Sequence, residues 1–136
     1  MHHMNTSSSD SKGNLALVET YYHHMLQKDF DAMAKCLHPE VLFIGPLAEM
    51  SGKKAVIEAA KNLTQILSNI EIRAKFSSDN QIILAYDFIF PDPIGQLRAA
   101  VLMEFEDQLI SKIELFYDGK PFEQKKNEIF SDTNAN

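Results

Sequence analysis

The sequence predicts an α+β domain in which the helices come first and the sheet follows. Apolar residues recur at helical spacing in the first part of the chain, and after Asn69 their period changes to two. Helices followed by a strand meander are typical of an α+β fold with the helices packed on one sheet face. With 136 residues, the chain suits one core. We expect a disordered polar tail over 1–13, the domain over 14–119 and a polar C-terminal tail over 120–136.

Three helices are predicted ahead of the strand-rich part. The first ends near Lys28 and carries an apolar stripe made of Leu17, Val18, Tyr21 and Met25. Asp29 is a plausible N-cap for a short second helix, which His38-Pro39 ends. The third helix follows Gly52, and its stripe consists of Val56, Ala60, Leu63 and Leu67.

Five strands are predicted, and the first, Val41–Ile44, lies between the second and third helices. The segment from Pro46 to Gly52 is expected to be a loop. A second strand follows Asn69, with apolar residues at Ile70, Ile72, Ala74 and Phe76 alternating with charged ones. The remaining strands are 81–90, 97–106 and 109–118, separated by turn-forming residues.

Composition excludes several functional classes. The net charge of -6 gives no basic surface for non-specific nucleic-acid binding. No apolar run is long enough to span a membrane, and the N-terminus lacks the pattern of a secretion signal, so a cytoplasmic location is expected. Cys36 is the only cysteine, and His23 and His24 are not at metal-binding spacing. We therefore expect no metal site and no cofactor.

Several motifs resemble the NTF2-like, or SnoaL-like, superfamily, which includes ketosteroid isomerase. They are the segments 21–32 and 36–46, the glycine-led helix start at Gly52-Lys53-Lys54-Ala55-Val56, and the closing strand 112–118. The resemblance covers about 15–119. It implies a cone in which a curved antiparallel sheet wraps over the three N-terminal helices and encloses a mostly apolar cavity.

The resemblance also implies which residues could be catalytic. In the isomerase branch a carboxylate directly precedes the proline and acts as general base, but here that position is Gly45. Tyr21 matches the tyrosine that polarises the substrate carbonyl, whereas the protonated sheet acid is replaced by Val101. We therefore expect no steroid-type isomerisation by that mechanism. Tyr21 remains a catalytic candidate, although a buried tyrosine on this stripe could equally be core filler.

The predicted cavity lining follows from the same resemblance. We expect the ligand-binding residues to be Tyr21, Met25, Phe43, Val101, Met103 and Tyr117, with Val18, Val56 and Leu115 beside them. Tyr117 is also open to a plain core role.

Asp87 is the second catalytic candidate, because aspartate is unusual inside an apolar strand. If it faces the cavity, it could be a general acid or base. Period-two alternation puts it opposite Tyr86 and Phe88, which favours the outer face and an interface or salt-bridge role.

Two functional hypotheses remain. The first is binding of a small, mostly apolar molecule in the cone cavity, with an isomerase-, lyase- or cyclase-like reaction as one form of it. The second is a non-catalytic dimerisation or protein-interaction domain. A homodimer through the outer sheet face is expected, because the last strands also carry outward apolar residues, namely Ala100, Leu102, Ile110 and Phe116.

Overall fold

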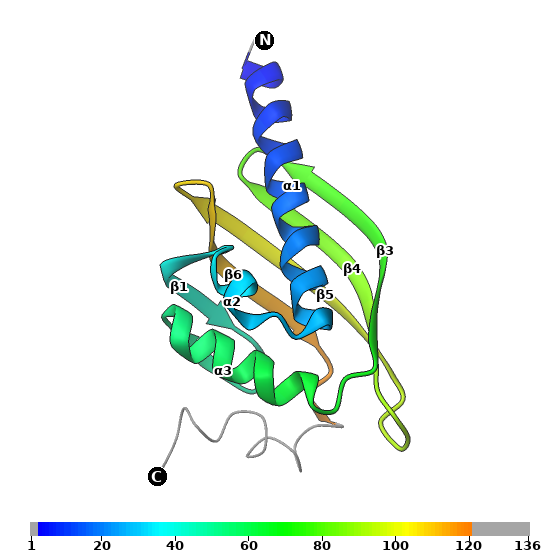
Figure 1. Cartoon of the computed structure of the whole chain (residues 1–136). Helices are drawn as coiled ribbons and strands as arrows, with labels where there is room; N and C mark the ends of the chain where they lie inside the picture. Colours follow the sequence, from blue (N-terminus) through cyan, green and yellow to red (C-terminus); the bar gives the residue numbers. More distant parts are fainter. Residues whose placement is uncertain (1–2, 121–136) are drawn as a thin grey trace.

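The computed structural model describes residues 3–120 and contains three helices and six strands (Figure 1). In chain order the elements are α1 (His3–Gln27), α2 (Phe30–Ala34), β1 (Leu37–Ile44), β2 (Glu49–Ser51), α3 (Lys53–Thr64), β3 (Asn69–Ser78), β4 (Gln81–Ile89), β5 (Gln96–Glu106) and β6 (Leu109–Tyr117). The predicted α+β class is confirmed. Apart from Lys120, the tail expected over 120–136 lies outside the described residues.

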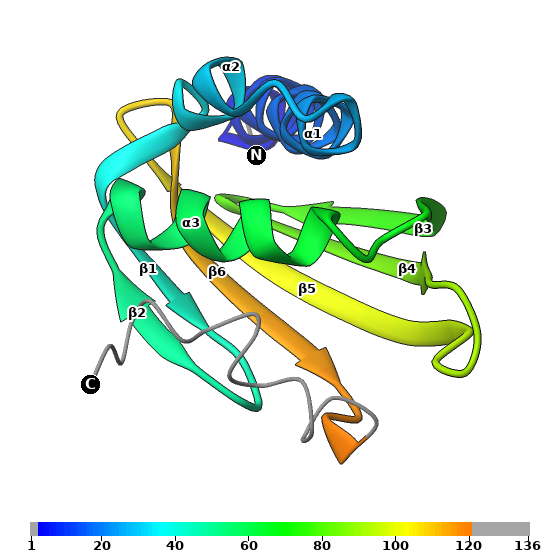
Figure 2. The ribbon, with the colours of Figure 1, turned by 60° about the horizontal axis from the view of Figure 1, so that its bottom comes forward.

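The strands form one curved sheet in the order β2-β1-β6-β5-β4-β3. Neighbouring strands are antiparallel except for β1 and β6, which are parallel, so the sheet is mixed rather than antiparallel throughout as expected. No hairpin links β1 to β6, and the long chain between them permits the parallel pairing. Figure 2 shows the three helices on the same side of this curved sheet.

Three element boundaries differ from those predicted. Helix α1 starts at His3, so residues 3–13 are helical instead of loose. Figure 1 shows this end of α1 projecting past the sheet, and a helix already nucleated on the sheet can add polar turns at little cost. Strand β1 starts at Leu37, since α2 ends at Ala34. The short strand β2 lies in the segment expected to be a loop and pairs with the end of β1.

A register shift in β3 reverses the faces of its second half. Ile72 pairs with Tyr86 and Ala74 with Ala85, so Arg73 is an extra residue without a partner on β4. Beyond this bulge Lys75 lies on the helix side, where its Nζ is 2.6 Å from Glu19 Oε2 on α1. Phe76 lies on the outer face and is 63% exposed, although the period-two pattern predicts it to point inward. Bulges of this kind bend and twist the strand that carries them.

The core lies between the helices and the inner sheet face. It includes Leu84 and Tyr86 from β4, and Val101 and Met103 from β5, all of them fully buried. Ile110 is also fully buried, and this corrects the expectation that it faces outward. A second register shift, between Glu104 and Phe105, pairs Ile110 with Phe105 and so turns it inward.

The predicted cap of the second helix is confirmed. The backbone N–H of Ala32 donates to Asp29 Oδ1 over 3.2 Å, which satisfies one of the free donors at the start of α2. At the start of α3, Gly52 has a φ of 94°, a backbone conformation that favours glycine. Asp29 and Gly52 therefore mark where α2 and α3 begin.

Candidate functional site

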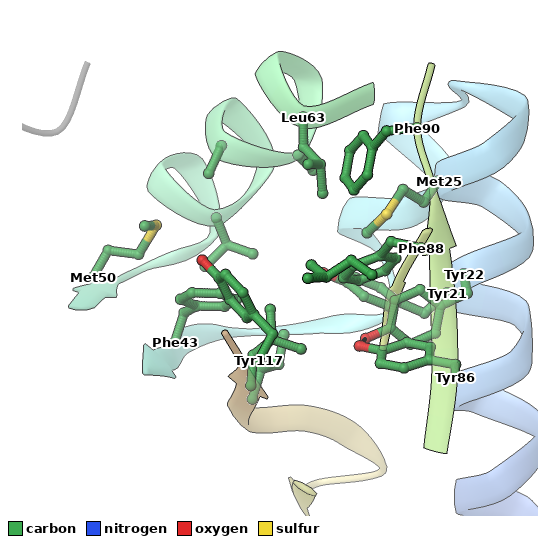
Figure 3. A pocket seen from close by; sticks show the side chains of 16 residues that line it. Tyr21, Tyr22, Met25, Phe43, Met50, Leu63, Tyr86, Phe88, Phe90 and Tyr117 are labelled. Carbon is green, nitrogen blue, oxygen red and sulfur yellow. Dashed lines mark hydrogen bonds between the residues drawn. The ribbon is translucent and has the colours of Figure 1, made fainter. Parts of the chain in front are cut away.

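A cavity of about 80 Å³ lies between α1, α3 and the inner sheet face. Figure 3 shows the side chains that line it, with Phe43 and Tyr117 on one side and the tyrosines of α1 and β4 on the other. The lining residues are Tyr21, Tyr22, Met25, Phe43, Met50, Val56, Ala59, Ala60, Leu63, Tyr86, Phe88, Phe90, Leu97, Ile113, Leu115 and Tyr117. None of these side chains carries a charge at neutral pH, so the polar atoms available to a ligand are chiefly tyrosine hydroxyls.

Burial separates the inner wall of the cavity from its mouth. The wall formed by α1 and β4 is buried, and Tyr21, Tyr86 and Phe88 are 3%, 0% and 4% exposed. The opposite side, which forms the mouth, consists of partly exposed residues of β1, α3 and β6, namely Phe43, Ala59, Leu63, Leu115 and Tyr117. A ligand would therefore enter past α3 and β6 and meet the tyrosines at the inner wall.

Two of the inner tyrosines are hydrogen-bonded to each other. The hydroxyl oxygens of Tyr22 on α1 and Tyr86 on β4 are 2.7 Å apart. The rings meet edge to face, with centroids 5.2 Å apart, and Tyr21 packs against Tyr22 in the same way at 5.1 Å. Three hydroxyl-bearing rings are thus held together on one side of the cavity.

Burial keeps these phenols protonated. Removal from water raises the pKa of Tyr21 and of Tyr22 well above the ordinary value, and the neighbouring phenol adds to the rise in each. Burial also raises the pKa of Tyr86. At the mouth, partial burial raises the pKa of Tyr117 to about 12. At neutral pH the cavity therefore presents neutral hydroxyl groups, which can both donate and accept hydrogen bonds.

Most of the predicted lining residues lie at the cavity. Tyr21, Met25, Phe43 and Tyr117 line it, as do Val56 and Leu115, and whether they bind a ligand stays a prediction.

Three others, Val18, Val101 and Met103, are fully buried and are not among the lining residues, which corrects their assignment. Val101 pairs with Leu84, two residues along the strands from the pair of Tyr86 with Ala99. The cavity ends near the bulky Tyr86 ring, and the residues beyond that ring are solid core.

Asp87 is not at the cavity, which removes it as a candidate acid or base there. It lies on the outer sheet face, opposite Tyr86 and Phe88, and it is only 3% exposed. Its carboxylate accepts hydrogen bonds from Arg73 Nε at 3.1 Å and from Gln96 Nε2 at 2.7 Å. The aspartate that looked anomalous in the sequence is a satisfied structural ion pair.

Sequence reasoning missed part of the inner wall. Tyr86 and Phe88 on β4 alternate with Phe90 directly after it, and their period of two already predicted that they face the helices. That signal was sufficient to place them in the cavity. Tyr22 was missed because the apolar stripe of the first helix was assigned Tyr21 but not its neighbour Tyr22, whereas both side chains are buried.

Neither a metal-binding cluster nor a membrane-spanning helix occurs in the described part of the chain. Over 3–120, no three histidine, cysteine, aspartate or glutamate side chains are grouped so that they could hold a metal ion. In the same range no helix has the length and apolar character needed to cross a membrane. The cytoplasmic location stays a prediction from sequence.

Comparison with known families decides what kind of domain this is. The family model for the SnoaL-like domain matches residues 18–113, which is more than half of the chain. The chain belongs to the SnoaL-like domain family. A search of the curated proteins finds no match.

Solved structures share the SnoaL-like fold at low sequence identity. An NTF2-like protein of unknown function from Cytophaga hutchinsonii has a TM-score of 0.70 and 20% identity, over 80% of this chain and 93% of that one. A steroid delta-isomerase from Pseudomonas aeruginosa has a TM-score of 0.71 and 16% identity, over 90% and 92%. A de novo designed protein with a curved β-sheet has a TM-score of 0.77 and 18% identity, over 88% and 96%. At such identities the SnoaL-like fold is shared, and function must be argued from the site.

Proposed function

We propose that this SnoaL-like protein binds a small, uncharged, mostly apolar molecule in the cavity between α1, α3 and the sheet. The observation that carries the proposal is a lining of apolar and aromatic side chains with neutral hydroxyls on its buried wall. Burying an ion in such a lining would be costly because no opposite charge lines the cavity. Small-molecule sites commonly combine apolar walls with a few polar groups in this way.

The cavity limits the size of the ligand. Its volume of about 80 Å³ is well below the 300–1,000 Å³ of pockets for drug-sized molecules. An apolar cavity of about 150 Å³ in another protein holds benzene. The ligand proposed here is therefore no larger than a single ring, and admitting a ring requires the partly exposed side chains at the mouth to move aside.

A reaction in this cavity would have to use tyrosines. An isomerase-, lyase- or cyclase-like activity remains part of the proposal, with Tyr21 as the catalytic candidate. Gly45 occupies the position before Pro46. A Cβ on Gly45 would lie 3.1 Å from Phe43 Cε1, so a side chain at this position would press against the Phe43 ring. No carboxylate lines the cavity, so chemistry that needs a carboxylate base is not proposed.

Filling the cavity from its mouth is expected to abolish binding. Ala59→Phe places a ring at the partly exposed α3 side of the cavity, and we expect at least about tenfold weaker binding of any ligand, by loss of volume and contact. Lys54→Phe is the control, because Lys54 is on the same helix, is exposed and is not a lining residue. The measurements are native mass spectrometry of freshly purified protein and thermal shifts with a panel of small neutral molecules. Equal binding by both variants would contradict the proposed site.

A second function, association through the outer sheet face, is favoured by exposed apolar side chains. Phe76, Ile83 and Phe116 are 63%, 44% and 50% exposed. Ile83 lies between Phe76 and Leu102 in the register of β3, β4 and β5, and Phe116 on β6 pairs with Ala100, two residues along β5 from Leu102, so these side chains share one region of the outer face. We propose that a second copy of the chain covers this patch, since the same surface on both subunits satisfies two-fold symmetry.

The dimer is expected to dissociate when charge is placed in the patch. The Ile83→Glu, Phe116→Glu double variant adds two negative charges to the outer face, and light scattering should change from twice the chain mass to a mass near 15.4 kDa. Lys54→Glu makes the same change in net charge on α3 and should remain dimeric. A wild-type protein that is monomeric at micromolar concentration would refute the dimer without affecting the cavity proposal.

A further inference from the structure

We propose that residues 121–130, which follow the described part of the chain, dock across the mouth of the cavity and cover it. The apolar side chains of this segment, Phe122, Ile129 and Phe130, make the contacts. The cover controls access to the cavity of the proposed function, on which its role rests, while the docking itself can be tested without a ligand.

The mouth of the cavity is an apolar surface that the described residues leave partly open. Phe43 and Tyr117, which Figure 3 shows on the same side of the cavity, line this surface together with Leu115, and all three are only partly buried. Leu47 and Ala48, in the turn between β1 and β2, are also partly buried, next to the end of β1 that carries Phe43. An exposed apolar opening of this kind is a place where a further segment can pack.

The segment begins beside this mouth. Strand β6 ends at Tyr117, one of the mouth residues, and the described chain continues only to Lys120. The backbone of Gly119 lies against the turn between β1 and β2, since a Cβ on Gly119 would be 3.1 Å from Leu47 Cδ2. The backbone N–H of Lys120 donates to Asp118 Oδ1 over 3.0 Å, which closes a turn after β6. The chain is therefore held at the mouth and redirected there, directly before the segment starts.

The sequence of the segment has one apolar stripe. Ile129 and Phe130 follow Phe122 by seven and eight residues, the spacing that places side chains on one face of a helix. Pro121 suits the first turn of a helix, and the residues 123–128 between the apolar positions are all polar. The nine residues 122–130 would span about 13 Å as a helix, enough to cross from β6 to α3, because packed elements lie roughly 10 Å apart. The pattern thus predicts an amphipathic stretch that buries one face.

A tethered segment is favoured over a separate molecule as the cover. Its attachment at the mouth, where Gly119 packs against Leu47, keeps it at a high effective concentration there. Lys126 falls within the apolar stripe, and its long side chain can pack its stem while its charge stays in water, so docking brings no charge to the uncharged lining. A second copy bound to the outer sheet face cannot be the cover, because the cavity lies on the helix side of the sheet.

Chemical modification of Tyr117 tests the docking in the full chain without a ligand. The other three tyrosines are 3%, 5% and 0% exposed, so Tyr117 is the one open to nitration by tetranitromethane. The stripe variant, Phe122→Ser, Ile129→Ser, Phe130→Ser, removes the apolar contacts. We expect its Tyr117 to be nitrated about tenfold faster than that of the wild type, the factor for burial of about one apolar side chain. Mass spectrometry of the peptides locates the nitrated residue.

The matched control changes the opposite face of the same stretch. The Gln124→Ser, Asn127→Ser, Glu128→Ser variant carries as many serine substitutions and should be nitrated at the wild-type rate. Circular dichroism checks that both variants are folded. Equal nitration rates in the wild type and the stripe variant would overturn the docking, and so would an equal rise in both variants.

A measurement on the wild type covers the case in which the stripe variant does not fold. Docking should give nuclear Overhauser effects between the ring of Phe122 and the side chains of Leu47, Leu115 or Tyr117 at the mouth. Their absence from the spectra of the folded wild-type protein would overturn the inference.

Benzene, used as a probe of the cavity, separates the cover from the proposed function. Its release from the wild type should be about tenfold slower than from the stripe variant, because the segment must undock first. If benzene binds neither protein, the proposed function fails for this ligand size, while the nitration rates still decide whether the segment docks. Equally fast release from the two proteins would show that the segment does not close the entrance, and would overturn the cover.

Discussion

The protein is expected to unfold at alkaline pH before its inner tyrosines ionise. The chain has four tyrosines, and burial raises the pKa of each of Tyr21, Tyr22 and Tyr86 in the folded state. In the unfolded chain these phenols ionise near pH ~10. Above that pH the unfolded state binds fewer protons than the native state, so stability is complete below about pH 10 and is lost as pH rises toward the folded-state pKa values.

The size of this effect follows from proton counting. Each tyrosine that stays protonated in the native state but is ionised in the unfolded state costs about 1.4 kcal/mol per pH unit. Three such residues give a slope of roughly 4 kcal/mol per pH unit, which exhausts a typical stability of about 5–15 kcal/mol within a few pH units. The experiment is a titration in which tyrosinate absorbance and circular dichroism are recorded together.

The two signals should change together for the inner tyrosines, with Tyr117 free to titrate earlier because its pKa is raised only to about 12. Tyr22→Phe should reduce the slope by about one proton, while Tyr117→Phe should do so only below about pH 12, where Tyr117 is still protonated in the native state. Full ionisation of all the tyrosines in a protein with unchanged circular dichroism would show that the inner wall is accessible to solvent.

Arg73→Met is expected to destabilise the fold by about 2–3 kcal/mol. The change leaves the carboxylate of Asp87, which is 3% exposed, with Gln96 as its remaining side-chain partner. Removing one member of a buried ion pair is costly because the other charge is stranded. The full effect for a buried pair is about 3–5 kcal/mol, and the partial exposure of Arg73 lowers it here.

The control is another ion pair on the same strand. Lys75→Met breaks the bond to Glu19, but both of those side chains are about half exposed, so the expected loss is at most about 0.5–1 kcal/mol. The Arg73→Met, Asp87→Leu double variant should recover much of the loss, since no charge is stranded. Denaturant unfolding measures all of these free energies. An Arg73→Met cost no larger than that of Lys75→Met would show that Asp87 is solvated in solution.

Local sequence signals were enough to predict most of the fold. The stripe with Val18 and Met25 predicted α1, the cap at Asp29 predicted α2, and the change of period after Asn69 predicted the meander. The parallel pairing of β1 with β6 was not predictable in this way, because it joins segments about 70 residues apart and leaves no local pattern. The same holds for β2, whose three residues are too few to show a period.

The cavity was harder to predict than the sheet. Alternation shows which face of β5 carries Val101 and Met103, but it does not show how far the hollow extends along that face. The hollow ends at the ring of Tyr86 on the neighbouring strand, so its extent depends on packing between strands. The position of Asp87 was easier to predict. Alternation along β4 alone favoured the outer face for this residue, and it lies there in the structure.

The extra residue in β3 decides what a deletion at this point would change. Without Arg73, Ile72 would be joined directly to Ala74, and their partners Tyr86 and Ala85 are already consecutive on β4. The strand would then be regular while Lys75 and Phe76 kept the faces that they have now. A single-codon deletion would thus remove the ion pair to Asp87 and leave the aromatic group in the outer patch, so the charge balance of this face can change in evolution without the loss of its apolar surface.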